Sequence, residues 1–431
     1  MSSVQGGGPV TPRELARRVL DRVDKGGAWA TLALDAELAR SGLADRDRRL
    51  AAELVYGVLR NRSRIDRALG AHADLSRTPP KVRTALRVAA HQLLFLDRVP
   101  AYAAVDDAVG AARKEGGAKL AGFCNAVLRK ITRAGEPALP SELLARIEVE
   151  HSLPRWIVEE LAAAVEPAQL VAVAAAFGQE APLIARTNLR KTTRDALAAE
   201  LTAAGVTADP MPLVPTALRL DGLGDPGKSA SFLAGRWTVQ DAGAQLVGQL
   251  AAPRVGQRIL DACAGVGGKS THLAELADDA APIDAADQSK TKLDLLAASA
   301  ERLGLTSVTR HVCDLLDPAG PLAPAYDLIV LDAPCSGLGV LRRHPDAKWR
   351  LLPDTVPRMA ALQAQLLDAM VQRLAPGGAL IYSVCTFTRA EGPDQIAALV
   401  ARTGLRIVAE HRTWPPDADA FYLVRLERTA G

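Results

Sequence analysis

Two cysteines carry the strongest chemical signal in this chain of 431 residues. Cys335 lies in "DAPCSG" and Cys385 in "YSVCTF", and each follows an apolar run that predicts a buried strand. In a parallel sheet the carboxyl ends of neighbouring strands face the same crevice. A single buried cysteine is usually an inert small hydrophobe, as we interpret Cys124 and Cys313. Two thiols at adjacent strand ends instead predict a nucleophile.

A glycine-rich stretch, "DACAGVGGKST" at residues 261–271, predicts a loop that binds a ligand. Its Gly-Lys-Ser tail matches the phosphate loop of NTPases, but Cys263 stands where that motif needs its first glycine. "LIVLD", residues 328–332, could serve as the second NTPase motif, so the loop alone leaves this possibility open. The alternative is a turn whose backbone approaches a nucleoside cofactor. The residues of that turn are Cys263, Ala264, Gly265, Val266, Gly267, Gly268 and Lys269.

Acidic residues follow the next predicted strands. Asp287 ends "PIDAAD", 22 residues after Gly265, where a carboxylate can accept hydrogen bonds from ribose hydroxyls. Asp314 ends "HVCD", where an adenine amino group could be read. One acid after a strand is often only a helix N-cap, but acids after several successive strands favour a cofactor site. Because carboxylates repel a triphosphate, they suit S-adenosyl-L-methionine, with its neutral nucleoside and cationic end.

A thiol beside S-adenosyl-L-methionine suits methylation at C5 of a pyrimidine. C5 is too weak a nucleophile to attack a methyl sulfonium, but a thiolate that adds to C6 turns C5 into an enamine carbon. A base must then remove the C5 proton so that the thiol can leave. A carboxyl group at the base edge, such as Asp332, would favour protonation at N3 and ease the addition. The residues alone leave open which thiol attacks.

The part of the chain from Arg236 onward alternates between strand and helix patterns. The predicted strands are 258–263, 282–287, 308–313, 326–332, 378–385 and 421–427, and the predicted helices are 270–277, 290–303, 356–374 and 392–402. Such alternation predicts an α/β Rossmann-like domain with a mainly parallel, doubly wound sheet. Its ligands would bind beyond the carboxyl ends of the strands.

The front of the chain has the pattern of an all-α bundle. Thr11 can cap a helix that opens with Pro12, and breakers at 26–27, 78–80 and 115–117 divide the following stretch into six or seven helices. Over residues 1–140, 24 Lys and Arg face 15 Asp and Glu, which is +9, so the remainder carries −6 of the overall +3. This asymmetry predicts contact with a polyanion, most simply nucleic acid. The alternative is a basic helical surface without a partner.

We expect four parts: a disordered tail over 1–8, a helical domain over 9–140, a mixed α+β region for linkage and RNA recognition over 141–235 and a catalytic domain over 236–431. In the mixed region, "APLIARTNL" predicts a strand and "TRDALAAELTAAG" a helix. The five cysteines form no CxxC or Cys/His cluster, so we expect no metal site and a reducing, cytoplasmic location. No apolar run is long enough to predict a membrane span.

Beyond these patterns, the chain resembles the Sun/Fmu (RsmB-type) RNA cytosine-5 methyltransferases. The resemblance rests on "WTVQDAGAQLV", "DACAGVGGKSTHLAEL", "DAPCSGLGVLRRHPDAKW" and "YSVCTF". At the front, "DRDRRLAAELVYGVLR", "VPAYAAVDDAV" and "GFCNAVLRKI" resemble the NusB-like RNA-binding domain of these enzymes. The resemblance implies a monomeric class I methyltransferase that uses S-adenosyl-L-methionine on 16S rRNA or a small-subunit precursor.

The resemblance also assigns roles to residues. It implies that Cys385 is the nucleophile and that Cys335 assists release of the methylated base, and it places Asp287, Asp314 and Asp332 at or near the cofactor.

The chain also departs from the family pattern. The family loop reads Ala-Pro-Gly-Gly-Lys, but here Gly265-Val266 replaces Ala-Pro; Val384 precedes the later cysteine in place of Thr; and "RAEGPDQI" lacks the usual Glu-Asn pair. These departures leave open a function of another class, that of a catalytically impaired RNA-binding factor for ribosome assembly. The residues also leave open a DNA substrate and an NTPase activity.

Overall fold

The structure, a computed structural model, describes residues 10–429 and divides into two compact units. The first unit comprises the chain up to Gln179 together with Leu341–Leu351, and the second comprises Glu180–Val340 and the chain from Leu352. The Gly/Ser-rich residues 1–8, which we expected to be disordered, lie outside the described residues. No helix within residues 10–429 is both long and apolar enough to cross a membrane.

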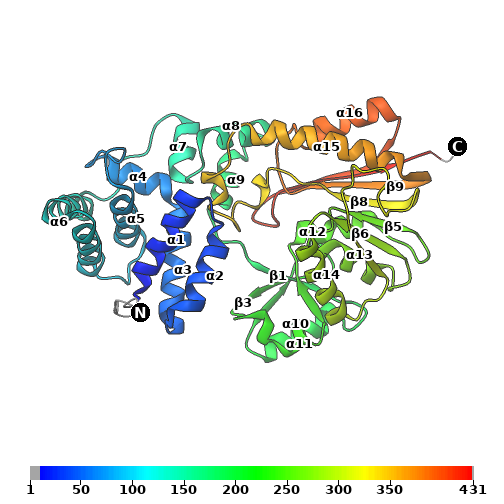
Figure 1. Ribbon diagram of the computed structural model, residues 1–431, viewed down its shortest axis with the longest axis horizontal. Helices are drawn as coiled ribbons and strands as arrows, with labels where there is room; N and C mark the ends of the chain where they lie inside the picture. Colours follow the sequence, from blue (N-terminus) through cyan, green and yellow to red (C-terminus); the bar gives the residue numbers. More distant parts are fainter. Residues whose placement is uncertain (1–9, 430–431) are drawn as a thin grey trace, which may run out of the picture. The chain divides into compact units, whose positions relative to one another are not determined.

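The first unit is built from helices, as predicted (Figure 1). Thr11 caps the first helix by accepting a hydrogen bond from Glu14 N, and Gly116 and Gly117 interrupt the sixth. The last three helices were not predicted. The helices are α1 (Pro12–Gly26), α2 (Ala30–Ser41), α3 (Asp45–Arg60), α4 (Arg62–Gly70), α5 (Pro80–Phe95), α6 (Ala101–Ala134), α7 (Leu143–Glu150), α8 (Arg155–Ala164) and α9 (Leu170–Phe177).

A short segment from the second half of the chain, Leu341–Leu351, belongs to this helical unit. Trp349 Nε1 donates to Leu59 O at 2.8 Å, and Lys348 Nζ donates to Arg60 O at 3.1 Å, both at the end of α3. Burial lowers the pKa of Lys348 to about 7. From the sequence we expected this segment in the catalytic domain, because no local pattern shows which unit a loop packs against.

The second unit begins with a small antiparallel sheet in the order β2-β3-β1-β4. Its members and neighbouring helices are β1 (Leu183–Thr187), α10 (Arg194–Ala203), β2 (Thr207–Pro210), β3 (Ala217–Asp221), α11 (Ala230–Leu233) and β4 (Trp237–Val239). β1 and α10 are the strand and helix predicted for the mixed region. Leu197 and Leu201 of α10 pack with Leu218 and Trp237 to form the core of this part.

The larger sheet has seven strands in the order β10-β11-β9-β8-β5-β6-β7. They are β5 (Ile259–Ala262), β6 (Ile283–Asp287), β7 (Val308–Val312), β8 (Tyr326–Asp332), β9 (Leu374–Val384), β10 (Arg406–Thr413) and β11 (Phe421–Glu427). β5 to β9 are parallel, and β11 runs antiparallel to β9. The predicted strands and the doubly wound topology are confirmed; β10, an edge strand with mostly exposed residues, was not predicted.

Helices cover both faces of this sheet (Figure 1). α12 (Ala242–Ala251), α13 (Gly268–Leu276) and α14 (Lys290–Leu303) lie on one face, and α15 (Thr355–Gln372) and α16 (Pro393–Thr403) on the other. Successive residues of a strand alternate between the two cores: Ile259 packs with the first group and Leu260 with the second. Since both faces are covered, the carboxyl ends of the parallel strands are where a ligand can bind.

Candidate active site

The glycine loop between β5 and α13 is a left-handed turn. Cys263, Gly265 and Gly267 have φ values of +62°, +57° and +83°. A Cβ atom on Gly267 would lie 2.3 Å from Cγ of Leu296 in α14, so both the backbone and the packing require glycine there. The left-handed φ at Gly265 favours the glycine that this chain carries there.

Asp287, at the end of β6, fastens this loop. Its Oδ2 accepts a hydrogen bond from Gly265 N at 2.9 Å, and its Oδ1 accepts one from Ser289 N at 2.8 Å. The N-cap of α14 is Ser289, so helix capping does not explain the acid at position 287. The structure thus brings together the loop and the first acid of the predicted cofactor site. Asp314 is exposed, and its carboxylate accepts a hydrogen bond from Leu316 N.

Lys269, in the first turn of α13, is paired with Asp332 at the end of β8. Its Nζ lies 2.5 Å from Asp332 Oδ2, and Asp332 Oδ1 accepts a hydrogen bond from Ser383 Oγ at 2.7 Å. Burial opposes the charge of Lys269, but the carboxylates of Asp332 and Asp261 outweigh it and raise the pKa of the lysine. A phosphate loop needs this lysine for its ligand. Because Lys269 instead forms an ion pair with Asp332, the structure argues against an NTPase.

Asp261 was not among the predicted site residues, but it supports the same turn. This residue of β5 is fully buried and accepts a hydrogen bond from Ser270 Oγ at 2.5 Å. Burial raises the pKa of Asp261 to about 7. It joins α13 to the strand that precedes the glycine loop. Its position inside a short apolar strand carried the only sequence signal, an acid where the strand pattern expects a hydrophobe.

The two predicted thiols meet. Cys335 follows β8 and Cys385 follows β9, and their Sγ atoms lie 3.3 Å apart. The contact with Cys385 and burial raise the pKa of Cys335 well above that of an ordinary thiol. Lys269 has a favourable electrostatic interaction with a negative charge on Cys385. The arrangement therefore keeps the proton on Cys335.

Glu391 joins the two loops that carry these cysteines. Its fully buried carboxylate accepts hydrogen bonds from Ser336 N at 2.7 Å, Ser336 Oγ at 2.5 Å and Thr388 Oγ1 at 2.9 Å. Gln363 Nε2 of α15 donates to the same carboxylate at 3.1 Å. This role was not predicted: "RAEGPDQI" drew notice only because it lacks the usual Glu-Asn pair of the family.

Comparison with known proteins shows what this arrangement resembles. Residues 248–418 match the family model described as "16S rRNA methyltransferase RsmB/F", residues 10–133 match "NusB family" and residues 153–225 match the ferredoxin-like domain of RsmF/B-like methyltransferases. "Probable ribosomal RNA small subunit methyltransferase B" of Synechocystis sp. is 36% identical over 94% of this chain and 90% of that protein. The chain belongs to the RsmB/F methyltransferase family.

Two other RsmB/F relatives are similar over the same extent. The "Ribosomal RNA small subunit methyltransferase B" of Pseudomonas putida is 37% identical and covers 91% of this chain and 90% of its own length. The probable enzyme of that name from Bacillus subtilis is 32% identical, with 94% and 90% coverage. Among solved structures, PH0851 matches with a TM-score of 0.81 at 23% identity over 98% of this chain and 100% of its own, which shows the shared fold.

The RsmB/F pattern puts a threonine where this chain has Val384, and the structure shows what that change affects. Val384 is fully buried in the apolar core beneath α15 and α16, on the face of β9 opposite to the one on which Cys385 packs. The missing hydroxyl would therefore lie on the side of the sheet opposite to Cys385, in the core against which Cys335 also packs. Cys263, within the loop, has its pKa raised to about 12 by burial and nearby carboxylates, so it remains a neutral thiol.

Proposed function

We propose that this chain is an S-adenosyl-L-methionine-dependent RNA cytosine-C5 methyltransferase that modifies 16S rRNA or a small-subunit precursor. Membership of the RsmB/F family supports an RNA methyltransferase. The observation that supports methylation at cytosine C5 is the pair of thiols, 3.3 Å apart at the ends of two neighbouring parallel strands. Methyl transfer to nitrogen or oxygen needs no covalent step, so such a pair of thiols would have no role in it.

The residues at the strand ends fit S-adenosyl-L-methionine. The left-handed glycine turn brings backbone groups to the start of α13, whose N-terminus has no side-chain cap. Asp287 and Asp332 supply carboxylates suited to hydroxyl and cationic groups, whereas a polyphosphate would be repelled. The residues that would hold it are the loop from Cys263 to Lys269, with Asp287, Asp314 and Asp332. When bound, it supplies an electrophilic methyl group. A structural neighbour, NSun6 from Pyrococcus horikoshii, was solved with SFG, an analogue of this cofactor.

The two cysteines then divide the work. The Cys385 thiolate forms a bond to C6 of cytosine, which moves electron density to C5 and lets it attack the methyl group. Loss of the C5 proton to a base and cleavage of the C6–S bond restore the aromatic ring and the thiolate. Cys335, whose Sγ lies beside that of Cys385, assists this release. Asp332, held by Lys269 and Ser383, would contact the edge of the base.

The catalytically impaired RNA-binding factor is the weaker proposal, since both thiols, the glycine turn and the strand-end acids are in place in the described residues. Other expectations remain predictions: the domain limits at 8, 140 and 235, a cytoplasmic location, a monomeric state and the absence of a metal. The basic helical front is the proposed RNA-binding part.

The direct test measures methyl transfer to 16S rRNA transcripts and to precursor particles, with the modified base located by bisulfite sequencing. The wild-type chain is expected to produce 5-methylcytosine, and Cys385→Ala none. Full turnover by Cys385→Ala would refute the assignment of the nucleophile. Cofactor binding by calorimetry separates the enzyme from the assembly factor, because a chain that binds RNA but no S-adenosyl-L-methionine would be the latter.

A further inference from the structure

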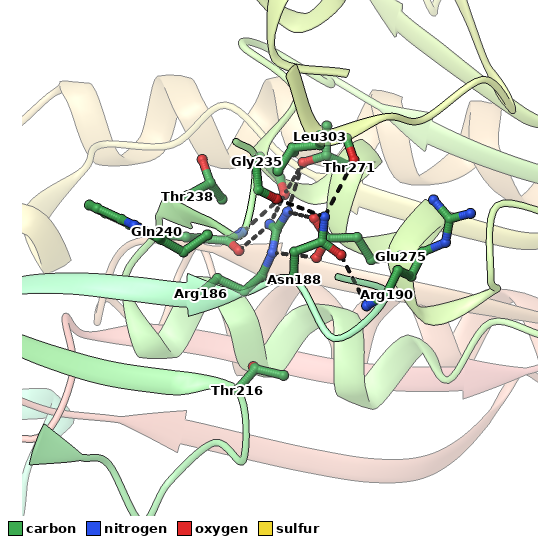
Figure 2. A network of polar contacts seen from close by, with 12 residues as sticks. Arg186, Asn188, Arg190, Thr216, Gly235, Thr238, Gln240, Thr271, Glu275 and Leu303 are labelled. Atoms are coloured by element: carbon green, nitrogen blue, oxygen red, sulfur yellow. Dashed lines mark hydrogen bonds and ion pairs between the residues drawn. The ribbon is translucent and has the colours of Figure 1, made fainter. Parts of the chain in front are cut away.

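Arg186, in β1 of the small sheet, lies completely buried against the catalytic part of the same unit. Figure 2 shows its guanidinium group among Gln240, Thr271 and Glu275. Arginine has five N–H donors, and all five are used here. Nε and Nη2 bind the two oxygens of Glu275 at 3.0 and 2.8 Å, Nη2 also donates to Thr271 Oγ1 at 3.0 Å, and Nη1 donates to Gln240 Oε1 at 2.5 Å and Gly268 O at 2.7 Å.

Three of these partners belong to α13, the helix that begins at the glycine loop. Gly268 is its first residue, and the Gly268 carbonyl also accepts a hydrogen bond from Gln240 Nε2 at 3.2 Å. Thr271, which accepts from Arg186, donates in turn to Gly267 O at 2.8 Å. The guanidinium thus orients two consecutive carbonyl groups at the turn. Lys269, the next residue, is the one paired with Asp332.

The neighbouring residues of the same segment hold the other helix next to the loop. Asn188 Nδ2 donates to Leu303 O at 3.4 Å (Figure 2), and Arg190 Nη1 donates to Gly304 O at 3.2 Å. Both carbonyls lie at the carboxyl end of α14. Donors and positive charge at a helix carboxyl end are favourable. The small sheet therefore contacts the two helices that follow the glycine loop and Asp287.

Stability alone does not explain a buried ion pair of this kind. Removing Arg186 and Glu275 from water carries a desolvation penalty, and apolar residues of similar volume often stabilise such a site equally well. What an apolar pair cannot do is hold Gly268 O and Thr271 in one geometry.

We propose that Arg186 is a positioning residue for the cofactor loop, through which the small sheet sets the affinity for S-adenosyl-L-methionine. This inference rests on the proposed function. Arg186 acts through Gly268 and Thr271 and need not touch the cofactor. It gives the small sheet a role in the cofactor site, in addition to the RNA recognition that we expected of this region.

The test replaces the ion pair as a whole, Arg186→Met with Glu275→Leu, so that no buried charge is left unpaired. The dissociation constant for S-adenosyl-L-methionine, measured by calorimetry, is expected to rise roughly tenfold or more. Hydrogen exchange of the amides at 264–272 is expected to be faster without any ligand, with the rest of the unit unchanged. The matched control is Arg219→Met in β3 of the same sheet, an exposed residue that donates to Asp221; it leaves the contacts with α13 and α14 in place and is expected to keep wild-type affinity.

Wild-type affinity and wild-type exchange in the folded double variant would overturn the inference. General loss of protection at unchanged affinity would overturn it too, because a merely structural role predicts that result. If the double variant does not fold, Arg186→Lys decides: its ammonium keeps the charge near Glu275 but cannot span Gly268 and Gln240 as well, so unchanged affinity there refutes the proposal. Failure of the wild-type chain to bind the cofactor would instead refute the proposed function, and the exchange comparison would still decide the role of Arg186.

Discussion

The Sγ atoms of Cys335 and Cys385 lie 3.3 Å apart although 50 residues separate the two cysteines in the chain. The contact joins the ends of β8 and β9, which pair in parallel. Cys335 keeps its proton because the neighbouring thiol and burial raise its pKa. Because the two thiols have different proposed roles, replacing each is expected to have a different effect.

Cys335→Ala is expected to trap the enzyme on its RNA. Without the second thiol, the C6–S bond to Cys385 forms but is not released, so a covalent protein–RNA complex should accumulate and be visible on denaturing gels. The double variant Cys335→Ala/Cys385→Ala should form none, and Cys313→Ala is the control for loss of an inert thiol. A complex that persists in the double variant would show that another group attacks the base.

Glu391→Gln is expected to slow methyl transfer while leaving cofactor affinity unchanged. An amide nitrogen would replace one carboxylate oxygen and face a donor from Ser336 or Gln363, and leaving such a group unsatisfied costs about 1–3 kcal/mol. Because these partners of Glu391 lie outside the glycine loop, the effect should appear in kcat and in thermal stability. Asp394→Asn, an exposed acid nearby, is the control. Unchanged kcat in Glu391→Gln would mean that the cysteine loops need no such support.

Gly267→Ala is expected to weaken cofactor binding and to destabilise the fold. The new methyl group would meet Leu296 at 2.3 Å, and overpacking of this kind costs about 1–3 kcal/mol beyond the strain of a left-handed backbone. Gly256→Ala, with φ of +79° and open space around it, measures the backbone strain alone. In a double-mutant cycle, Gly267→Ala should cost less stability in a Leu296→Ala background than in wild type, because the clash with Cγ of Leu296 is then absent. An equal cost in both backgrounds would place the strain elsewhere in the turn.

Asp261 predicts a pH dependence of stability. Its pKa is raised from 3.8 to about 7 by burial, so between these values the folded chain holds a proton that the unfolded chain has released. The stabilisation is complete below the lower value and is lost as the pH rises to about 7, by at most about 1.4 kcal/mol per pH unit.

The measurement compares Asp261→Asn with wild type by denaturant unfolding from pH 5 to pH 8. Asparagine stays neutral, so the variant should gain stability relative to wild type as the pH rises. A difference that does not change with pH would contradict a raised pKa at this site.

Features that depend on neighbouring residues could be predicted from the sequence. Thr11, followed by Pro12, predicted a capped helix, and the apolar runs before Asp287 and Asp332 predicted the strands they end. Alternation of such strands with helices determined the doubly wound topology, because a crossover connection in a parallel sheet allows few arrangements. That topology was enough to place the glycine loop, the acids and both thiols at one edge.

The tertiary structure decided which of these residues touch, because side-chain contacts between distant segments leave no periodic signal. It pairs Lys269 with Asp332, so the lysine is engaged with a carboxylate. It buries Glu391 between the cysteine loops and Arg186 against the start of α13. It also assigns residues 341–351 to the helical unit, although in the sequence they lie between β8 and α15, which belong to the second unit. Each of these depends on packing between residues far apart in the chain, which only the folded chain brings within reach.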